Sequence, residues 1–147
     1  MVTCKKWNIT LDFKLKVHPL AKVCTPFDIM FNENNIKNRV DGTCGMGVGA
    51  TMNRHNSTQF KLFAIDLLNL DLVEVKLLAI HRYYGFTLGD KELKKVITDF
   101  KNACKEAPVT LVDYEGLNKS KYFNFIFEGS QGIMLDMDFG TIPNVTY

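Results

Sequence analysis

The stretch that decides the fold of this chain is Asp71-Leu-Val-Glu-Val-Lys-Leu-Leu-Ala-Ile-His-Arg-Tyr-Tyr84-Gly85. Its apolar residues recur about every three to four positions, which is the period of an amphipathic helix. An acidic residue at the start suits a helix N-terminus, and glycine is a typical stop signal. We therefore predict a helix over residues 71–84, with an apolar face made of Leu72, Val75, Leu78, Ile80 and Tyr83.

A second helix is predicted over residues 88–107, where Pro108 marks the end and Asp90 can cap the start. Its apolar stripe consists of Leu93, Val96, Ile97, Phe100 and Cys104. Two such helices in 147 residues indicate a mainly α fold with a small β component.

The N-terminal half gives weaker signals. Alternating apolar residues in Trp7–Val17 predict a strand. Pro19 can open a helical turn, and a helix from about Thr25 is expected after the interruption by a second proline. Residues 32–49 are polar and then rich in glycine, which is typical of a loop. The apolar residues 59–68 fit either a helix or a buried strand.

Two segments follow the second helix. Val109–Val112 fits either a strand or the first turn of another helix. Tyr122–Phe127 is apolar at nearly every position, as expected for a strand covered on both faces.

The composition excludes several classes of protein. The chain has 18 basic and 16 acidic residues, a net charge of +2, 46% hydrophobic residues and 23% charged residues. These values are ordinary for a globular protein and argue against a disordered chain or a polybasic nucleic-acid tail. There is no apolar run of membrane-spanning length and no apolar core of a signal peptide. We expect a cytoplasmic protein with reduced cysteines that binds neither nucleic acid nor membrane.

The first glycine-rich segment is Gly42-Thr-Cys-Gly-Met-Gly-Val-Gly49. Spaced glycines let backbone amides approach an anion closely, and Thr43 adds a hydroxyl donor. The segment lacks the lysine of a Walker A loop. Taken alone, it fits either a flexible turn or an anion-binding loop.

The second segment runs from Phe127 to Thr141 and leaves the predicted buried strand at its carboxyl end, where ligands bind in open α/β sheets. Gln131 offers both donors and an acceptor to an amide-like edge of a purine. Asp136 and Asp138 lie two residues apart and fit either a cation site or caps for backbone amides.

The residues from 127 to 146, Phe-Glu-Gly-Ser-Gln-Gly-Ile-Met-Leu-Asp-Met-Asp-Phe-Gly-Thr-Ile-Pro-Asn-Val-Thr, resemble the signature of the adenylosuccinate synthetase family. The segment Gly42–Gly49 resembles an upstream glycine loop of that family. Asp66-Leu-Leu and the helix end at 81–86 fall where the family has similar motifs. The resemblance covers most of the chain and is weakest before residue 17.

This resemblance implies a purine-nucleotide ligase that joins aspartate to inosine monophosphate (IMP), with GTP and magnesium as cofactors of the full-length family. Gln131 would lie beside the six-position of the purine, and Thr146 would bind the 5′-phosphate. Thr43, Cys44 and Gly45 would cradle the same nucleotide. A homodimer is implied, in which Arg54 could contact the nucleotide phosphate across the interface; the alternative is a solvent-exposed arginine.

The resemblance also implies an organisation. Residues 1–107 would contain the strand-like N-terminus, the glycine loop and a helical subdomain. Residues 108–147 would contribute one strand and a nucleotide-contacting loop to a P-loop-like α/β sheet.

The sequence departs from the family at several points. Cys44 and Met46 replace a threonine and an arginine of the family loop, and the N-terminal GTP loop and the catalytic histidine do not occur. We therefore expect a divergent central portion of such an enzyme, inactive in isolation, with no catalytic or metal-binding residue and no cofactor bound by this chain alone. The alternatives are a non-catalytic nucleotide-binding or subunit-interaction module and an aspartate ligase for another purine nucleotide.

Overall fold

The protein is described by a computed structural model, which places residues 2–4, 9–11, 15–35, 45–107, 109–113, 115–116 and 140–141. Helix α4 (Leu70–Tyr84) begins where the Asn69 side chain accepts hydrogen bonds from two backbone amides, and it ends at Gly85, whose φ is 69°. Both devices are common at helix ends. The predicted helix over residues 71–84 is therefore confirmed.

The predicted apolar face of α4 is partly wrong. The helix buries Val73, Leu77 and Ile80, whereas Val75 is 64% exposed. The three buried residues are spaced by four and three, so they form one stripe along the side that meets the core. Of the predicted face, only Ile80 belongs to the fully buried stripe.

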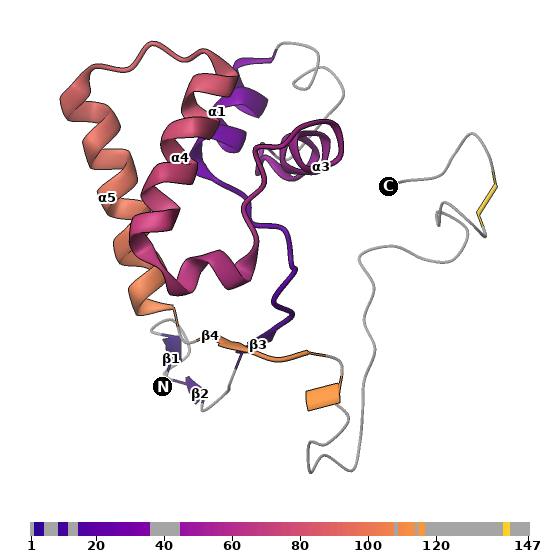
Figure 1. The fold of residues 1–147 in the computed structure, drawn as a ribbon. Coiled ribbons are helices and arrows are strands. Elements are labelled where there is room, and N and C mark those ends of the chain that lie inside the picture. The colour runs from indigo at the N-terminus through magenta and orange to yellow at the C-terminus, as the bar shows by residue number, and fades with distance from the viewer. Residues whose placement is uncertain are drawn as a thin grey trace.

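Helix α5 (Asp90–Glu106) packs beside α4, as Figure 1 shows. Ile97 is buried, and Leu93, Val96 and Phe100 pack against the core, which confirms these four members of the predicted stripe. Cys104, its fifth member, is only partly buried and is not among the residues packed against the core. The predicted cap is wrong, because Gly89 occupies the N-cap position and Asp90 is the first helical residue.

Two shorter helices precede this pair. Helix α1 (Pro26–Asn34) starts at Thr25, whose hydroxyl accepts a hydrogen bond from the Asp28 amide. The proline takes the first helical position, where its missing N–H costs nothing. Pro19 does not open a helix; it lies in a turn closed by a hydrogen bond from the Ala21 amide to the His18 carbonyl. Helix α3 spans Val48–Ser57 and contacts α1.

The segment before α4 is neither of the two structures expected for residues 59–68. Phe63 forms a single β-bridge with Lys22, and a short 3-10 helix, η1 (Ala64–Leu68), follows. The bridge ties this segment to the chain that leads into α1, because the Val23 amide donates to the Leu62 carbonyl and the Ala64 amide donates to the Ala21 carbonyl.

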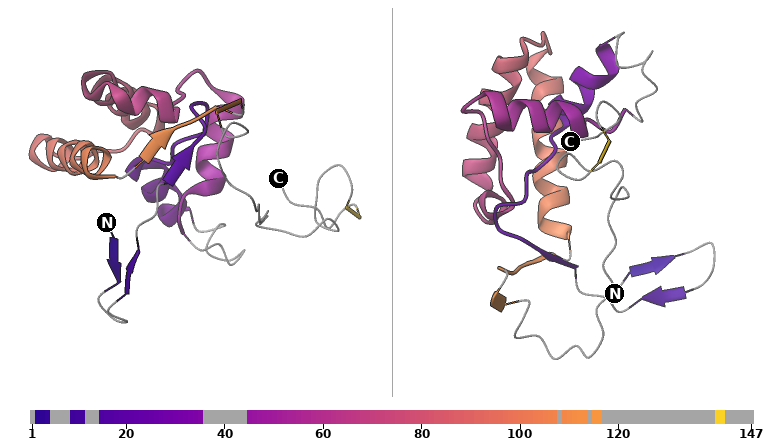
Figure 2. Two further views of the ribbon diagram at one scale, coloured as in Figure 1. Left: turned by 90° about the horizontal axis from the view of Figure 1, so that it is seen from below. Right: turned by 90° about the vertical axis from the view of Figure 1, so that its right-hand side faces the viewer.

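Four short strands complete the described structure. Strands β1 (Val2–Cys4) and β2 (Ile9–Leu11) pair in antiparallel fashion. Strands β3 (Leu15–Val17) and β4 (Val109–Leu111) pair in parallel and run side by side in Figure 2. The single strand predicted for residues 7–17 is thus divided into β2 and β3, and the open choice for residues 109–112 resolves to a strand.

The expected mainly helical fold with a small β component is confirmed. The strand predicted for Tyr122–Phe127 lies outside the described residues, so its place in a P-loop-like sheet stays a prediction. The predicted domain boundary between residues 107 and 108 falls between α5 and β4, and the division itself also stays a prediction.

The helices enclose one apolar core whose fully buried members come from α1, the segment before η1, α4 and α5: Phe27, Leu62, Val73, Leu77, Ile80 and Ile97. Among the described helices, none has the length and apolar character needed to cross a membrane. The core fixes α1 against α4, and α3 packs on α1.

Candidate functional site

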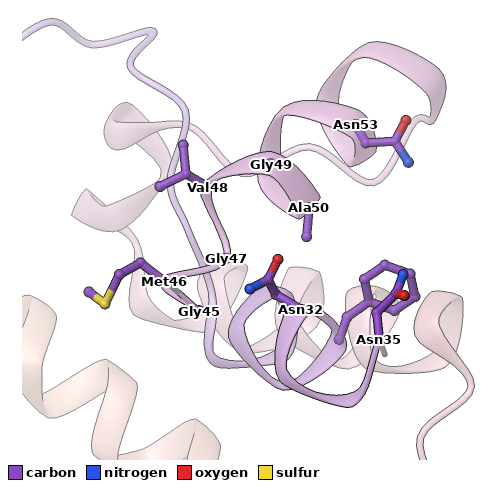
Figure 3. Close-up of a pocket in the computed structure, with 10 residues that line it drawn as sticks. Asn32, Asn35, Gly45, Met46, Gly47, Val48, Gly49, Ala50 and Asn53 are labelled. Atoms are coloured by element: carbon purple, nitrogen blue, oxygen red, sulfur yellow. The ribbon is translucent and has the colours of Figure 1, made fainter. Parts of the chain in front are cut away.

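A pocket of about 400 Å³ opens between the second half of α1 and the first turns of α3. Figure 3 shows Asn32 pointing toward the start of α3, while Met46 and Val48 turn away. The lining residues are Phe31, Asn32, Asn35, Gly45, Met46, Gly47, Val48, Gly49, Ala50 and Asn53.

The glycine-rich segment forms one edge of this pocket. Gly45 and Gly47 both have a φ of 74°, a conformation that side chains disfavour. Gly47 is the N-cap residue of α3 and has no side chain with which to cap the first amides of that helix. These amides and the helix dipole favour a negatively charged group at this end.

Three asparagines supply amide groups to the pocket. Asn32 and Asn35 come from α1 and its end, and Asn53 comes from α3. A carboxamide both donates and accepts hydrogen bonds, which suits the sugar or base of a nucleotide better than a bare anion. The pocket thus combines backbone donors at one edge with neutral polar side chains at the others.

A buried ion pair lies behind the pocket and joins its two helices. The side chains of Asp28 on α1 and Arg54 on α3 are both fully buried. Arg54 donates to both carboxylate oxygens, with its Nε and Nη2 each 2.8 Å from an oxygen of Asp28. It also donates to the carbonyl oxygens of Val23 and Phe60. The guanidinium therefore uses four of its five N–H groups inside the protein.

The carboxylate of Asp28 is also fully satisfied. It accepts hydrogen bonds from the Thr25 amide, the Thr25 hydroxyl and the Tyr84 hydroxyl, each at 2.7 Å. Burial alone would raise the pKa of Asp28, but the hydrogen bonds from Arg54, Tyr84 and Thr25 outweigh it and lower this pKa below its usual value. Asp28 is therefore ionised at neutral pH and holds α1, α3 and α4 together.

The described residues contain only part of the predicted site. Gly45 lines the pocket, and its contact with a nucleotide stays a prediction. Thr43, Cys44, Gln131 and Thr146 lie outside the described residues, as do both aspartates of the second glycine-rich segment. Their proposed contacts stay predictions.

Arg54 takes a position that the sequence did not suggest. The alternative of a solvent-exposed arginine is wrong, because the side chain is fully buried. The predicted contact with a nucleotide phosphate stays a prediction, and the occupied donors of the guanidinium weigh against it.

Several residues of the site were not predicted from the sequence. The spacing Thr25-x-x-Asp28 is a capping-box pattern that places an acid at the start of a helix, and it could have singled out Asp28. The asparagines of the pocket carry no comparable signal, because Asn32 and Asn53 come together only when α1 and α3 pack.

His55 does not line this pocket and is 2% exposed. Its Nε2 accepts a hydrogen bond from the Leu62 amide at 3.4 Å, and its ring packs edge-on against Phe63. Burial, together with the charges of Arg54 and Lys22, lowers its pKa to about 4. His55 is therefore neutral in the folded protein at pH 7.

The depressed pKa of His55 predicts a stability that falls with acidification. Between about pH 6.5 and pH 4, His55 binds a proton in the unfolded chain but not in the folded chain. The free energy of unfolding therefore decreases as the pH falls. The expected loss is on the order of 2 kcal/mol across this window. Urea titrations at several pH values check it, and His55→Gln should flatten the slope. An unchanged slope in the variant would assign the pH dependence to other groups.

Two comparisons relate the chain to known proteins. The family model for adenylosuccinate synthetase matches residues 1–147. An adenylosuccinate synthetase from Crocosphaera subtropica is 29% identical over 156 residues, which covers 97% of this chain and 34% of the relative. One from Microcystis aeruginosa is 30% identical over 95% of the chain and 33% of the relative. One from Neisseria gonorrhoeae is 27% identical over 92% of the chain and 34% of the relative.

The chain thus spans about a third of the length of the curated relatives it matches. No solved structure matches it.

Proposed function

The chain belongs to the adenylosuccinate synthetase family, and on that premise we propose that its pocket holds the purine nucleotide of a ligase that joins aspartate to IMP. The observation that carries this proposal is the glycine segment at the start of α3, which presents backbone amides to a pocket lined by asparagines. Nucleotide phosphates are bound in this way at many helix N-termini.

We assign roles to the predicted site residues within this proposal. Thr43, Cys44 and Gly45 cradle the nucleotide from the loop before α3. Gln131 faces the six-position of the purine, and Thr146 binds the 5′-phosphate. Arg54 is left out of this set, because its donors already bind Asp28 and two backbone carbonyls.

The reaction proposed for the whole enzyme has two steps. The purine oxygen at the six-position takes the terminal phosphoryl group of GTP, and the aspartate amine then displaces inorganic phosphate. When bound, GTP and magnesium supply the phosphoryl group and the positive charge that stabilises its transfer. The residues of this chain bind and orient the nucleotide.

The described residues include no cluster of three or more His, Cys, Asp or Glu side chains that could hold a metal ion, so we assign none of them a role in binding magnesium. A homodimer and a cytoplasmic location belong to this proposal as well. The absence of turnover by the isolated chain stays a prediction.

An alternative is a ligase for another purine nucleotide, suggested by Cys44 and Met46 in place of the family residues. The Met46 side chain is 60% exposed and turns away from the pocket in Figure 3. Its replacement of an arginine therefore changes the rim of the pocket rather than its interior.

The proposal is tested by calorimetric titration of the chain with IMP and, separately, with guanosine monophosphate. We expect binding of IMP, and Asn53→Ala should weaken it roughly fivefold, the effect of one lost hydrogen bond. Asn56→Ala is the matched control, because Asn56 lies on the same helix but does not line the pocket. Tighter binding of guanosine monophosphate would favour the alternative ligand. An absence of binding for both nucleotides would contradict the proposal for this chain.

A further inference from the structure

Tyr84, the last residue of α4, contacts both walls of the pocket without lining it. Its ring stacks on the ring of Phe31, a lining residue from α1, with centroids 4.8 Å apart. Its hydroxyl oxygen lies 3.4 Å from the carbonyl oxygen of Ala50, a lining residue from α3. One side chain outside the pocket therefore touches a residue from each of the two helices that form it.

The same hydroxyl also reaches the ion pair that joins the two walls. It donates a hydrogen bond of 2.7 Å to Oδ1 of Asp28, the oxygen that also accepts from the Nε of Arg54. Burial and the hydrogen bond to Asp28 raise the pKa of the Tyr84 phenol above its usual value. The phenol therefore keeps its proton and remains a donor at any pH near neutrality.

The position of Tyr84 is itself well fixed. Gly85 ends α4 directly after it in a left-handed conformation, with a φ of 69°. The rings of Tyr83 and Phe86 pack against its ring at 4.9 Å and 5.7 Å. A side chain held this firmly can help to fix the position of the groups that it touches.

From these contacts we infer that Tyr84 is a positioning residue for the nucleotide pocket: its hydroxyl sets the distance between α1 and the glycine-rich start of α3. The expected effect of Tyr84 on nucleotide binding rests on the proposed function. Its effect on the distance between the two helices does not depend on a ligand. The hydroxyl acts on α3 through its hydrogen bond to Asp28, the carboxylate that binds Arg54 of that helix, while its contact with the Ala50 carbonyl oxygen is one of proximity only. Loss of this contact would let the amides at the pocket edge move away from the nucleotide.

The test compares Tyr84→Phe with Tyr83→Phe. Each variant loses one hydroxyl from a neighbouring tyrosine, but the Tyr83 hydroxyl has no hydrogen bond in the part of the chain that the structure describes. We expect Tyr84→Phe to weaken IMP binding roughly fivefold to tenfold. We also expect it to shift the amide NMR signals of Gly45, Gly47 and Gly49 in the free protein. Tyr83→Phe should do neither.

A third variant separates positioning from a general loss of stability. Thr25→Val removes a different donor to the same carboxylate, together with the N-cap acceptor of α1, from a residue that does not line the pocket. It should lower the melting temperature at least as much as Tyr84→Phe does while leaving the three glycine signals in place. Equal shifts of these signals in both variants would overturn the inference, because Tyr84 would then act only as one of several stabilising contacts.

The two proposals fail in different ways. If the unaltered chain does not bind IMP, the proposed function fails, and the glycine signals alone decide whether Tyr84 positions the loop. If the chain binds IMP and Tyr84→Phe binds it equally well, the inference about Tyr84 is wrong and the proposed function stands.

Should Tyr84→Phe not fold, hydrogen exchange in the unaltered chain replaces it. The amides of Thr51 and Gly85 should then exchange through one shared opening, as expected for elements joined by a common contact. Independent exchange of the two would overturn the inference.

Discussion

Replacing Arg54 with methionine is expected to lower the free energy of unfolding by about 3–5 kcal/mol, the range found when one partner of a buried ion pair is removed. Methionine fills much of the space but leaves the Asp28 carboxylate buried without its cation. It also leaves the carbonyl oxygens of Val23 and Phe60 without their donor. Urea denaturation followed by circular dichroism measures the loss.

The double variant Asp28→Leu/Arg54→Met shows whether the charge is the cause. Because neither buried charge remains, its loss of stability should be smaller than the sum of the two single losses by about 2 kcal/mol. Additive losses would mean that packing and the helix cap, rather than the charge pair, dominate at this site.

An exposed pair gives the matched comparison. Lys101 on α5 bridges Glu74 on α4, and these side chains are 21% and 49% exposed. Water already solvates both charges, so Lys101→Met should cost under about 1 kcal/mol. A cost close to that of Arg54→Met would contradict the argument that burial makes the difference.

The helices that the sequence predicted well are those in which apolar residues carry the burial. In α5 the stripe that includes Ile97 and Phe100 faces the core as expected. In α4 apolar residues lie on more than one side of the helix. Which of them is buried depends on the elements that pack against the helix, and these bury Val73 and leave Val75 exposed. The apolar periodicity thus predicted the presence of the helix more reliably than which of its faces is buried.

Helix α3 could not be predicted in the same way, because most of its buried side chains are polar. Thr51, Arg54 and His55 are buried, and a hydrophobic pattern registers none of them. The partner of Arg54 lies 26 residues earlier in the chain, on a different helix. A contact of that kind depends on the packing of α1 against α3, so local sequence rules do not reach it.

The glycine segment shows the same division between local and distant causes. Its glycine content indicated that the backbone closely approaches another group, and a bound anion was one candidate for that group. The structure adds a second reason for glycine at position 47, where a β-carbon would lie 2.8 Å from the backbone nitrogen of Ile29. The close approach here is between α1 and the start of α3.

Gly47→Ala is therefore expected to lower the free energy of unfolding by roughly 2–4 kcal/mol, from two causes. The left-handed φ of 74° costs about 1–2 kcal/mol for any side chain. The remainder comes from forcing α1 and the start of α3 apart, because backbone atoms of Ile29 and Asp28 cannot rotate out of the way. Thermal and urea denaturation of the variant measure the loss.

Two other glycines of the same segment isolate the two causes. Gly45 has the same φ of 74° but open space where a β-carbon would lie, so Gly45→Ala should cost only about 1–2 kcal/mol. Gly49 lies inside α3 with open space, and Gly49→Ala should be neutral or stabilising by up to about 1 kcal/mol. If Gly47→Ala costs no more than Gly45→Ala, the close packing of α1 on the glycine segment does not constrain this protein. A larger cost at Gly47 alone would mean that the packing of α1 on the start of α3 sets the position of the pocket edge.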